Sequence, residues 1–185
     1  MVFEYILKNN GIDPATDLEI NQSIDFGSTA AAFTGDMSAD FTVEFEPSAT
    51  ALEKEGAGYV VASLGVDSGY VPYTSYSAKT SFLNENPQVI QSFTNALQKG
   101  MDYVQNHSPE EIAQMISPQF PETDMDTLTT IVNRYYEQDT WKENLVFEKD
   151  SFELLQDILE GAGELEKRVD YEQLVTTEFA NAAIN

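Results

Sequence analysis

The chain has 185 residues, of which 9 are Lys or Arg and 32 are Asp or Glu, so its formal net charge is −23. Apolar residues make up 42% of the chain, which is enough for a folded core and excludes a disordered acidic tail. Without a basic patch the chain is a poor partner for nucleic acid or for an anionic membrane surface. The length suits one domain, or one domain with helices appended to it.

Cysteine is absent from the chain, and His107 is its one histidine. These two facts exclude disulfides, thiolate catalysis, cysteine-based zinc sites and clusters of histidine ligands. We therefore predict no cofactor and no metal. Because His107 stands between two predicted helices, we interpret it as a helix C-terminal residue favoured by the helix dipole, ahead of a catalytic base.

Residues 1–80 alternate patterns that are typical of helices and strands. Helices are predicted near residues 3–9, 30–33 and 47–55, and strands are predicted at 17–21, 40–45, 59–64 and 70–76. The segment 40–45 has the clearest strand pattern, because apolar residues occupy alternate positions in it. Strands separated by short helices imply right-handed crossovers and a parallel sheet. The expected fold class is α/β, with a mostly parallel sheet flanked by helices.

Residues 81–185 are predicted to be almost entirely helical. A long helix begins at Pro87 and carries an apolar stripe. Three further helices begin near Ser108-Pro109, Thr123-Asp124 and Asp150-Ser151, each with a residue that caps helix N-termini well. We therefore divide the chain into an α/β part, residues 1–80, and a helical part, residues 81–185.

The first candidate for ligand binding is the predicted strand-to-helix turn that contains Gly27, Ser28 and Thr29. Free backbone N–H groups at the start of a helix attract anions and polar groups, and the two hydroxyls add donors. Ordinary capping of the helix explains the same residues. The glycine pattern of a P-loop or a dinucleotide-binding turn is absent.

The second candidate is the pair Glu44 and Glu46, which flank Phe45 at the end of the predicted strand 40–45. Ligands of open parallel sheets bind at the carboxyl ends of the strands. Two glutamates beside an aromatic ring suit an amine, an amidine or an aminopyrimidine. A solvated strand end with a carboxylate placed by the helix dipole remains an equal alternative.

The third candidate is a group of tyrosines in the predicted edge strand 70–76. Tyr70 and Tyr73 combine an apolar ring with a polar tip, as residues that line ligand clefts often do. Tyrosines are also common on edge strands, and that interpretation competes with the functional one.

The segments Phe3–Pro14, Phe41–Glu53 and Asn86–Pro87, in this order, give the chain a family resemblance. It resembles the substrate-binding proteins of ABC importers of the nitrate/sulfonate/taurine and thiamine-precursor (pyrimidine) type. The resemblance extends over essentially the whole chain and corresponds to the later part of those proteins.

This resemblance implies a type II periplasmic-binding-protein fold, in which a ligand sits in a cleft between two lobes. Residues 1–80 would then form much of lobe two without its first strand, and residues 81–185 would pack back toward an absent lobe one. Gly27, Ser28, Thr29, Glu44 and Glu46 would face the cleft. The implied partners are a small polar ligand and the permease subunits of the transporter.

The resemblance also implies a non-enzymatic protein, outside the cytoplasm, with a lipid anchor in its full-length form. No signal peptide is expected at the beginning of the given chain, since residues 1–5 lack a basic region. Two alternatives remain. One is an enzyme related to pyrimidine-synthesising proteins on the same scaffold, and the other is a non-binding fragment that depends on a partner. In the second case the apolar helix faces would favour self-association.

Overall fold

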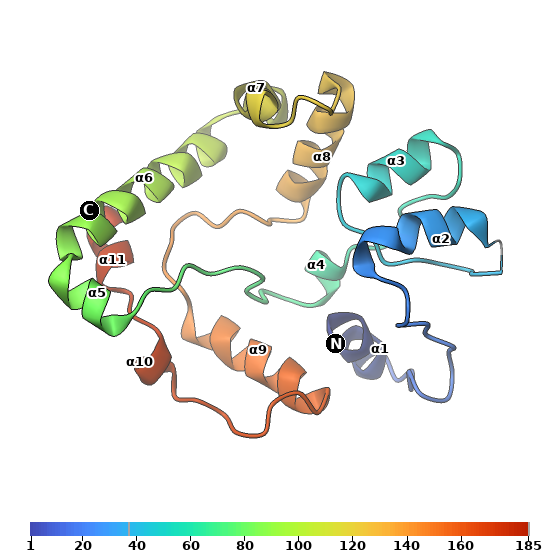
Figure 1. Ribbon diagram of the computed structural model, residues 1–185, viewed down its shortest axis with the longest axis horizontal. Coiled ribbons are helices and arrows are strands. Elements are labelled where there is room, and N and C mark those ends of the chain that lie inside the picture. Colours follow the sequence, from blue (N-terminus) through green and yellow to red (C-terminus); the bar gives the residue numbers. More distant parts are fainter. Residues whose placement is uncertain (37, 185) are drawn as a thin grey trace. The chain divides into compact units, whose positions relative to one another are not determined.

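The structure is a computed structural model that describes residues 1–36 and 38–184. Its regular elements are helices joined by turns and extended chain (Figure 1). In chain order they are α1 (Val2–Asn9), η1 (Phe26–Ser28), α2 (Thr29–Gly35), α3 (Ser48–Lys54), α4 (Leu64–Asp67), α5 (Thr80–Glu85), α6 (Pro87–Asn106), α7 (Pro109–Ile116), η2 (Ser117–Gln119), α8 (Met125–Glu137), α9 (Lys149–Gly161), α10 (Tyr171–Leu174) and α11 (Glu178–Ile184).

The predicted α/β fold with a mostly parallel sheet is wrong for the residues described. Across residues 1–36 and 38–184 the structure assigns no residue to a β-strand. The segments predicted as strands lie as extended chain or turns. In the described part of the chain, the backbone hydrogen bonds outside the helices join residues no more than five apart, so they form turns and caps and no ladder. A type II periplasmic-binding-protein lobe, which requires such a sheet, is not what this structure contains.

The physical reason is that an alternating pattern specifies two side-chain faces but provides no neighbouring strand. Segment 40–45 keeps its alternation, since Phe41, Val43 and Phe45 are exposed at 46%, 36% and 42% while the residues between them are half-buried. Its backbone groups need a second strand to form a ladder. The local prediction of extended chain holds there, and the prediction of a sheet fails.

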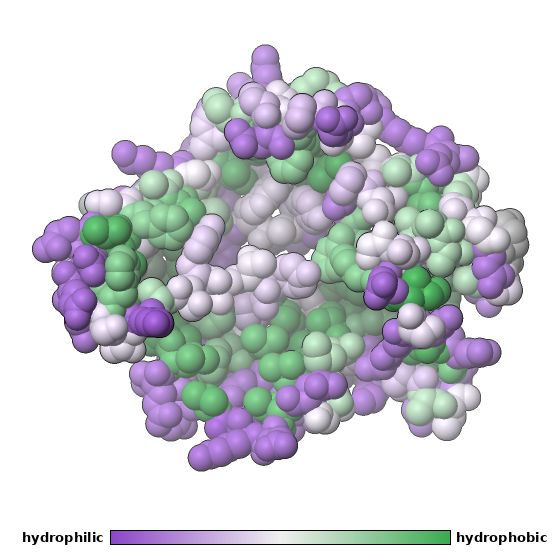
Figure 2. Space-filling view, viewed as in Figure 1, coloured by the Kyte–Doolittle hydropathy of each residue, from purple (hydrophilic) through white to green (hydrophobic). Residues whose placement is uncertain are grey.

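Apolar residues reach the visible surface in several places (Figure 2).

The helical predictions are largely confirmed. The long helix predicted from Pro87 is α6, and the starts predicted near residues 108, 123 and 150 correspond to α7, α8 and α9. Gly11 follows α1 with a φ of 76°, a left-handed conformation that suits glycine after a helix. The sequence patterns did not predict four short helices individually: α4, α5, α10 and α11.

The chain forms two compact units. Unit 1 comprises Met1–Ile6, Leu64–Ser108 and Asp139–Asn185, and unit 2 comprises Leu7–Ser63 and Pro109–Gln138. Each unit is therefore assembled from segments that are distant in the sequence. The predicted organisation into residues 1–80 and 81–185 stays a prediction.

The core of unit 2 lies where α8 packs on α7 and α3. Ile112 and Ala113 of α7 and Leu128 and Val132 of α8 are each at most 3% exposed. Their spacing along each helix places them on one face, as expected of an amphipathic helix that buries one stripe. Leu52 of α3 is also buried, at 7% exposed. This core holds α3, and with it the segment before α3, against α8.

In unit 1, α11 packs along α6, and α10 packs on α9 (Figure 1). Phe152 of α9 is buried and stacks edge-on against Phe147 and Tyr171, with ring centroids 6.2 and 5.7 Å away. The side-chain amide of Gln156 binds the backbone N–H and C=O of Val169. These contacts attach the chain that follows α9 to the helix itself.

No helix in the described part of the chain is both long and apolar enough to cross a membrane.

The start of α8 generates a prediction about pH. Asp124 caps this helix, and its carboxylate accepts hydrogen bonds from the hydroxyl of Thr127 at 2.6 Å and from the backbone N–H of Thr127 at 3.0 Å. These bonds, the hydroxyl first, lower the pKa of Asp124 to about 2. Because the folded pKa lies below the ordinary value of 3.8, the cap stabilises unit 2 fully above about pH 4 and loses its effect as the pH falls toward about 2.

We expect Asp124→Asn to remove this pH-dependent contribution, since an amide still caps the helix but does not ionise. The checks are an NMR titration of the Asp124 carboxyl carbon and urea unfolding at descending pH. Asp67→Asn, the same change at an exposed aspartate of α4, is the control. An Asp124 pKa at its ordinary value would contradict the assignment.

Candidate functional site

The turn that carries Gly27, Ser28 and Thr29 is exposed and short. These residues belong to η1 and to the beginning of α2, which has seven residues. The backbone N–H of Ser28 donates to the carbonyl of Asp25 at 2.8 Å, and the hydroxyl of Thr29 donates to the carbonyl of Phe26 at 3.0 Å. Ser28 provides no side-chain cap for α2. The local bonds thus hold the turn together while Gly27 and Ser28 face outward.

Two aromatic rings bring this turn to the segment that carries Glu44 and Glu46. Phe26 and Phe45 meet edge to face, with ring centroids 5.0 Å apart and planes at 74°. Both rings are only partly covered, since Phe26 is 61% and Phe45 42% exposed. The structure therefore unites the first and second candidates of the sequence in one surface of unit 2. We call Phe26–Thr29 and Glu44–Glu46 together the aromatic–acid patch.

The two glutamates of the patch have different surroundings. The carboxylate of Glu44 accepts a hydrogen bond from the hydroxyl of Thr42 at 2.8 Å through Oε1. The side chain of Glu46 is 7% exposed, and its Oε1 pairs with Nη1 of Arg134 at 2.8 Å. Its Oε2 accepts from the backbone N–H of Thr50, in the first turn of α3, at 3.0 Å. Glu46 thus caps α3 and neutralises an arginine, so a ligand would have to displace these partners to reach it.

Arg134 is the functional-site neighbour that the sequence analysis missed. It lies on α8 and donates to Glu46, to the hydroxyl of Thr50 and to the carboxylate of Glu53. Burial acts to lower the pKa of Arg134, but the hydrogen bonds to Glu46 and Glu53, together with the charges of these two carboxylates, outweigh it and raise that pKa. The sequence did contain one signal for this pair. Arg134 lies among apolar positions of a predicted helix in a chain with few basic residues, and a cation in such a place needs an acidic partner inside the protein.

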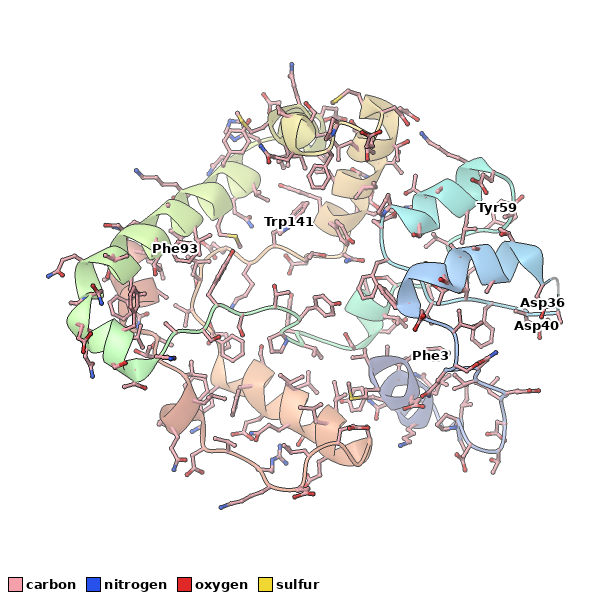
Figure 3. The ribbon with its side chains drawn as sticks, in the orientation of Figure 1. Phe3, Asp36, Asp40, Tyr59, Phe93 and Trp141 are labelled. Atoms are coloured by element: carbon pink, nitrogen blue, oxygen red, sulfur yellow. The ribbon has the colours of Figure 1, made fainter. Side chains whose placement is uncertain are left out.

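Glu53 connects this cluster to the exposed segment that follows α3. Its Oε1 accepts from the backbone N–H of Val60 at 2.8 Å, while its Oε2 binds Arg134. The bond from Val60 and then that from Arg134 lower the pKa of Glu53. The neighbouring ring of Tyr59 projects from this segment (Figure 3) and is 89% exposed. One arginine and one glutamate therefore fix two extended segments to the helices.

Tyr70 and Tyr73 belong to unit 1. The hydroxyl of Tyr70 donates to Oδ2 of Asp139 at 2.7 Å, and this bond, with the charge of Asp139, raises the pKa of Tyr70. Tyr73 is 80% exposed. In the same segment Tyr76 meets Phe93 of α6 edge to face, with ring centroids 5.0 Å apart. The roles of Tyr70 and Tyr73 in ligand binding stay predictions.

The described residues contain no group of three or more His, Cys, Asp or Glu side chains placed to hold a metal ion.

His107 follows α6, where its Nδ1 lies 2.7 Å from the carbonyl of Tyr103 and its ring stacks on that of Tyr103 with centroids 3.7 Å apart. The position matches that expected for a residue at a helix C-terminus.

Comparison with known proteins decides the family. The family model described as NMT1/THI5 like matches residues 1–112, which is more than half of the chain. The chain belongs to the NMT1/THI5-like family. This match confirms the family resemblance drawn from the sequence, to substrate-binding proteins of the nitrate/sulfonate/taurine and thiamine-precursor (pyrimidine) type. The substrate class within that family stays a prediction.

A curated relative of this NMT1/THI5-like chain is a protein of Bacillus subtilis (strain 168) named "Putative binding protein YtlA". It is 40% identical over 180 residues, which cover 97% of the present chain and 54% of the relative. The chain thus spans about half the length of the curated relative that it matches. The name of this relative agrees with a solute-binding role for the family.

The Arg134 cluster yields a stability prediction. Arg134→Ala leaves Glu46 buried without its counter-charge, and we expect it to lower the free energy of unfolding by about 2 to 4 kcal/mol. The value lies below that for a fully buried pair because a quarter of the Arg134 side chain is exposed. Replacing both partners, as in Arg134→Met with Glu46→Met, should cost less than the two single changes together, because no buried charge remains unpaired.

Urea unfolding of the unmodified chain, Arg134→Met, Glu46→Met and the double variant measures this cycle. The control is Arg168→Ala on α9, an exposed arginine that binds Glu153, Asp157 and Glu160. A surface arginine contributes less than a buried one. Equal losses for Arg134→Ala and Arg168→Ala would show that the Glu46 pair is not the stabilising contact.

Proposed function

We propose that this chain is part of a solute-binding protein that captures a small polar molecule for an ABC importer. The observation that carries the proposal is the family match over residues 1–112, joined by 40% identity to a protein named as a binding protein. The proposal includes permease subunits as partners and a location outside the cytoplasm, through a lipid anchor in the full-length protein. Self-association of the chain through exposed apolar faces remains part of the proposal.

The ligand class that the aromatic–acid patch favours is a flat heterocycle that donates hydrogen bonds, such as an aminopyrimidine. Phe26 and Phe45 offer partly exposed rings on which such a heterocycle can stack. Glu44 supplies a carboxylate whose Oε1 already accepts from Thr42, so its second oxygen is the acceptor for a ligand amino group.

Charge disfavours sulfonate or nitrate at the same place. Arg134 is the cation of this cluster, and Glu46 and Glu53 both bind its guanidinium group. An anion near Glu44 would be repelled by that carboxylate. The guanidinium group of Arg134 could not offset this repulsion, because Glu46 and Glu53 already bind it. Within the classes expected from the family resemblance, the patch therefore supports a vitamin or pyrimidine precursor ahead of the anions.

Isothermal titration of the chain with 4-aminopyrimidine, taurine and nitrate tests this proposal. We expect heat of binding from the aminopyrimidine, and about a tenfold weaker affinity for Glu44→Gln, equal to about 1.4 kcal/mol. Glu55→Gln, an exposed glutamate that follows α3, is the matched control and should bind as the unmodified chain does. Absence of heat with all three compounds would contradict solute binding, whereas binding of taurine or nitrate alone would overturn only the ligand class.

A pyrimidine-synthesising enzyme on this scaffold is the alternative, and His107 is the residue that would have to support it. Its ring is stacked on Tyr103 and hydrogen-bonded at the end of α6, which is a structural use of a histidine. We expect His107→Ala to lower the free energy of unfolding by about 1 kcal/mol and to leave the titrations above unchanged. Turnover of a pyrimidine-forming reaction that disappears in His107→Ala would establish the enzyme instead.

A further inference from the structure

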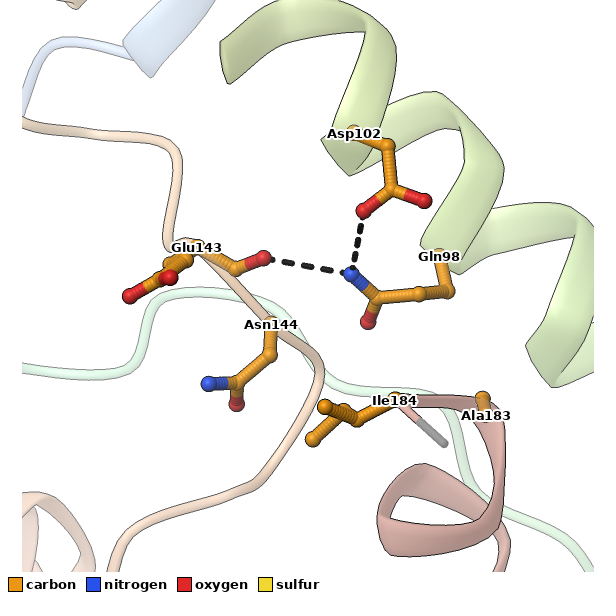
Figure 4. A pocket seen from close by; sticks show the side chains of 6 residues that line it. All are labelled: Gln98, Asp102, Glu143, Asn144, Ala183 and Ile184. Carbon is orange, nitrogen blue, oxygen red and sulfur yellow. Dashed lines mark hydrogen bonds between the residues drawn. The ribbon is translucent and has the colours of Figure 1, made fainter.

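Unit 1 contains a small polar pocket that no part of the proposed function uses. Six residues line it, and its volume is about 150 Å³ (Figure 4). They come from three segments: α6, the loop after α8 and the end of α11. The lining residues are Gln98, Asp102, Glu143, Asn144, Ala183 and Ile184.

Gln98 contributes a buried acceptor without a donor. Its Nε2 donates to Oδ1 of Asp102 at 2.9 Å and to the carbonyl of Glu143 at 3.2 Å. Since both partners are acceptors, the amide cannot be turned round without placing its oxygen against them. Gln98 is 6% exposed, and within the described part of the chain its Oε1 is buried with no hydrogen-bond partner. In Figure 4 this oxygen points into the space between Asn144 and Ile184.

Further hydrogen bonds hold the walls of the pocket in place. The side-chain amide of Gln91 on α6 donates to the carbonyl of Phe179 on α11 at 3.0 Å. Gln105, also on α6, donates to the carbonyl of Trp141 in the loop at 3.0 Å. Asn144 Oδ1 accepts from the backbone N–H of Val146 at 3.0 Å, which fixes this side chain. The unsatisfied oxygen therefore belongs to a formed pocket in which α6 is tied both to α11 and to the loop.

The lining selects the charge of an occupant. Among the described residues it contains the carboxylate of Asp102 and the backbone carbonyl of Glu143, and no basic side chain. The pocket also lies at the C-terminal turn of α11, where unpaired helix carbonyls carry partial negative charge. A group that donates hydrogen bonds and carries a positive charge satisfies these acceptors, whereas an anion is repelled by them.

We propose that this pocket binds a small organic cation with a primary ammonium group. The ammonium donates a hydrogen bond to Oε1 of Gln98, and the carboxylate of Asp102 balances its charge. A cavity of about 150 Å³ admits a molecule the size of benzene, or roughly six non-hydrogen atoms. The site is built from unit 1 alone and does not depend on the solute proposed for the aromatic–acid patch.

An NMR titration of the ¹⁵N-labelled chain with ethanolammonium chloride tests the proposal. We expect saturable shifts of the side-chain NH₂ signals of Gln98 and Asn144, weakened by added salt because charge contributes to binding. Ethylene glycol, a neutral compound of similar size, and acetate, an anion, should produce much smaller shifts. Equal shifts with ethylene glycol, or no shift with ethanolammonium, would leave water as the occupant and overturn the proposal.

Variants separate the acceptor from the charge. Gln98→Met keeps the length of the side chain and removes the acceptor, so we expect at least a tenfold loss of affinity for ethanolammonium. Gln88→Met, the same change at an exposed position of α6, should bind normally. Asp102→Asn alters little in shape and should lower both the affinity and its salt dependence. Affinity unchanged in both Gln98→Met and Asp102→Asn would overturn the proposal even if one variant is less stable.

Discussion

Positive charge is scarce in this chain, and each of its two arginines is shared among several carboxylates. Arg134 binds Glu46 and Glu53 in unit 2, and Arg168 binds Glu153, Asp157 and Glu160 in unit 1. With 32 acidic residues against 9 basic ones, carboxylates that are brought close together need such shared cations. Of the two, Arg134 is the more buried, and α3, the segment 44–46 and the chain around Val60 are all attached through its cluster.

This sharing decides what the aromatic–acid patch can offer to a ligand. Glu46 is used inside the protein, where it caps α3 and neutralises Arg134. Glu44 lies two residues away, and its carboxylate accepts a hydrogen bond from the hydroxyl of Thr42. The two glutamates look equivalent in the sequence, yet Glu46 is used structurally, and Glu44 is the one that we propose as the acceptor for a ligand. The partly exposed rings of Phe26 and Phe45 complete a surface that suits a flat, hydrogen-bond-donating molecule.

The pocket of unit 1 applies the same physical rule to a neutral group. An acceptor that is removed from water requires a donor, and Gln98 meets this requirement with its nitrogen but not with its oxygen. The oxygen points into a pocket that Asp102 helps to line. In both units, then, a carboxylate or an amide can bind a ligand only through those of its atoms that do not already form hydrogen bonds or ion pairs within the protein.

Local sequence patterns determined the long helices. Pro87 and the apolar stripe after it specify α6, and Asp124 specifies the beginning of α8, because helix hydrogen bonds and caps join residues close in the chain. They also determined the extended course of residues 40–45, and the family followed from the order of several short segments. Gly27–Thr29, Glu44, Glu46, Tyr70 and Tyr73 were named as site residues on the same local grounds.

Only the tertiary structure decided which of these features meet. The expected sheet is missing from the described residues because a strand needs a partner strand, and the side-chain alternation of Phe41, Val43 and Phe45 does not supply one. The pairing of Glu46 with Arg134 joins residues 88 apart, and the open oxygen of Gln98 results from contacts with a loop 45 residues away. The periodicity of apolar residues shows which face of one helix or strand is apolar. Pairing and burial depend on which other helix, strand or loop packs against that face.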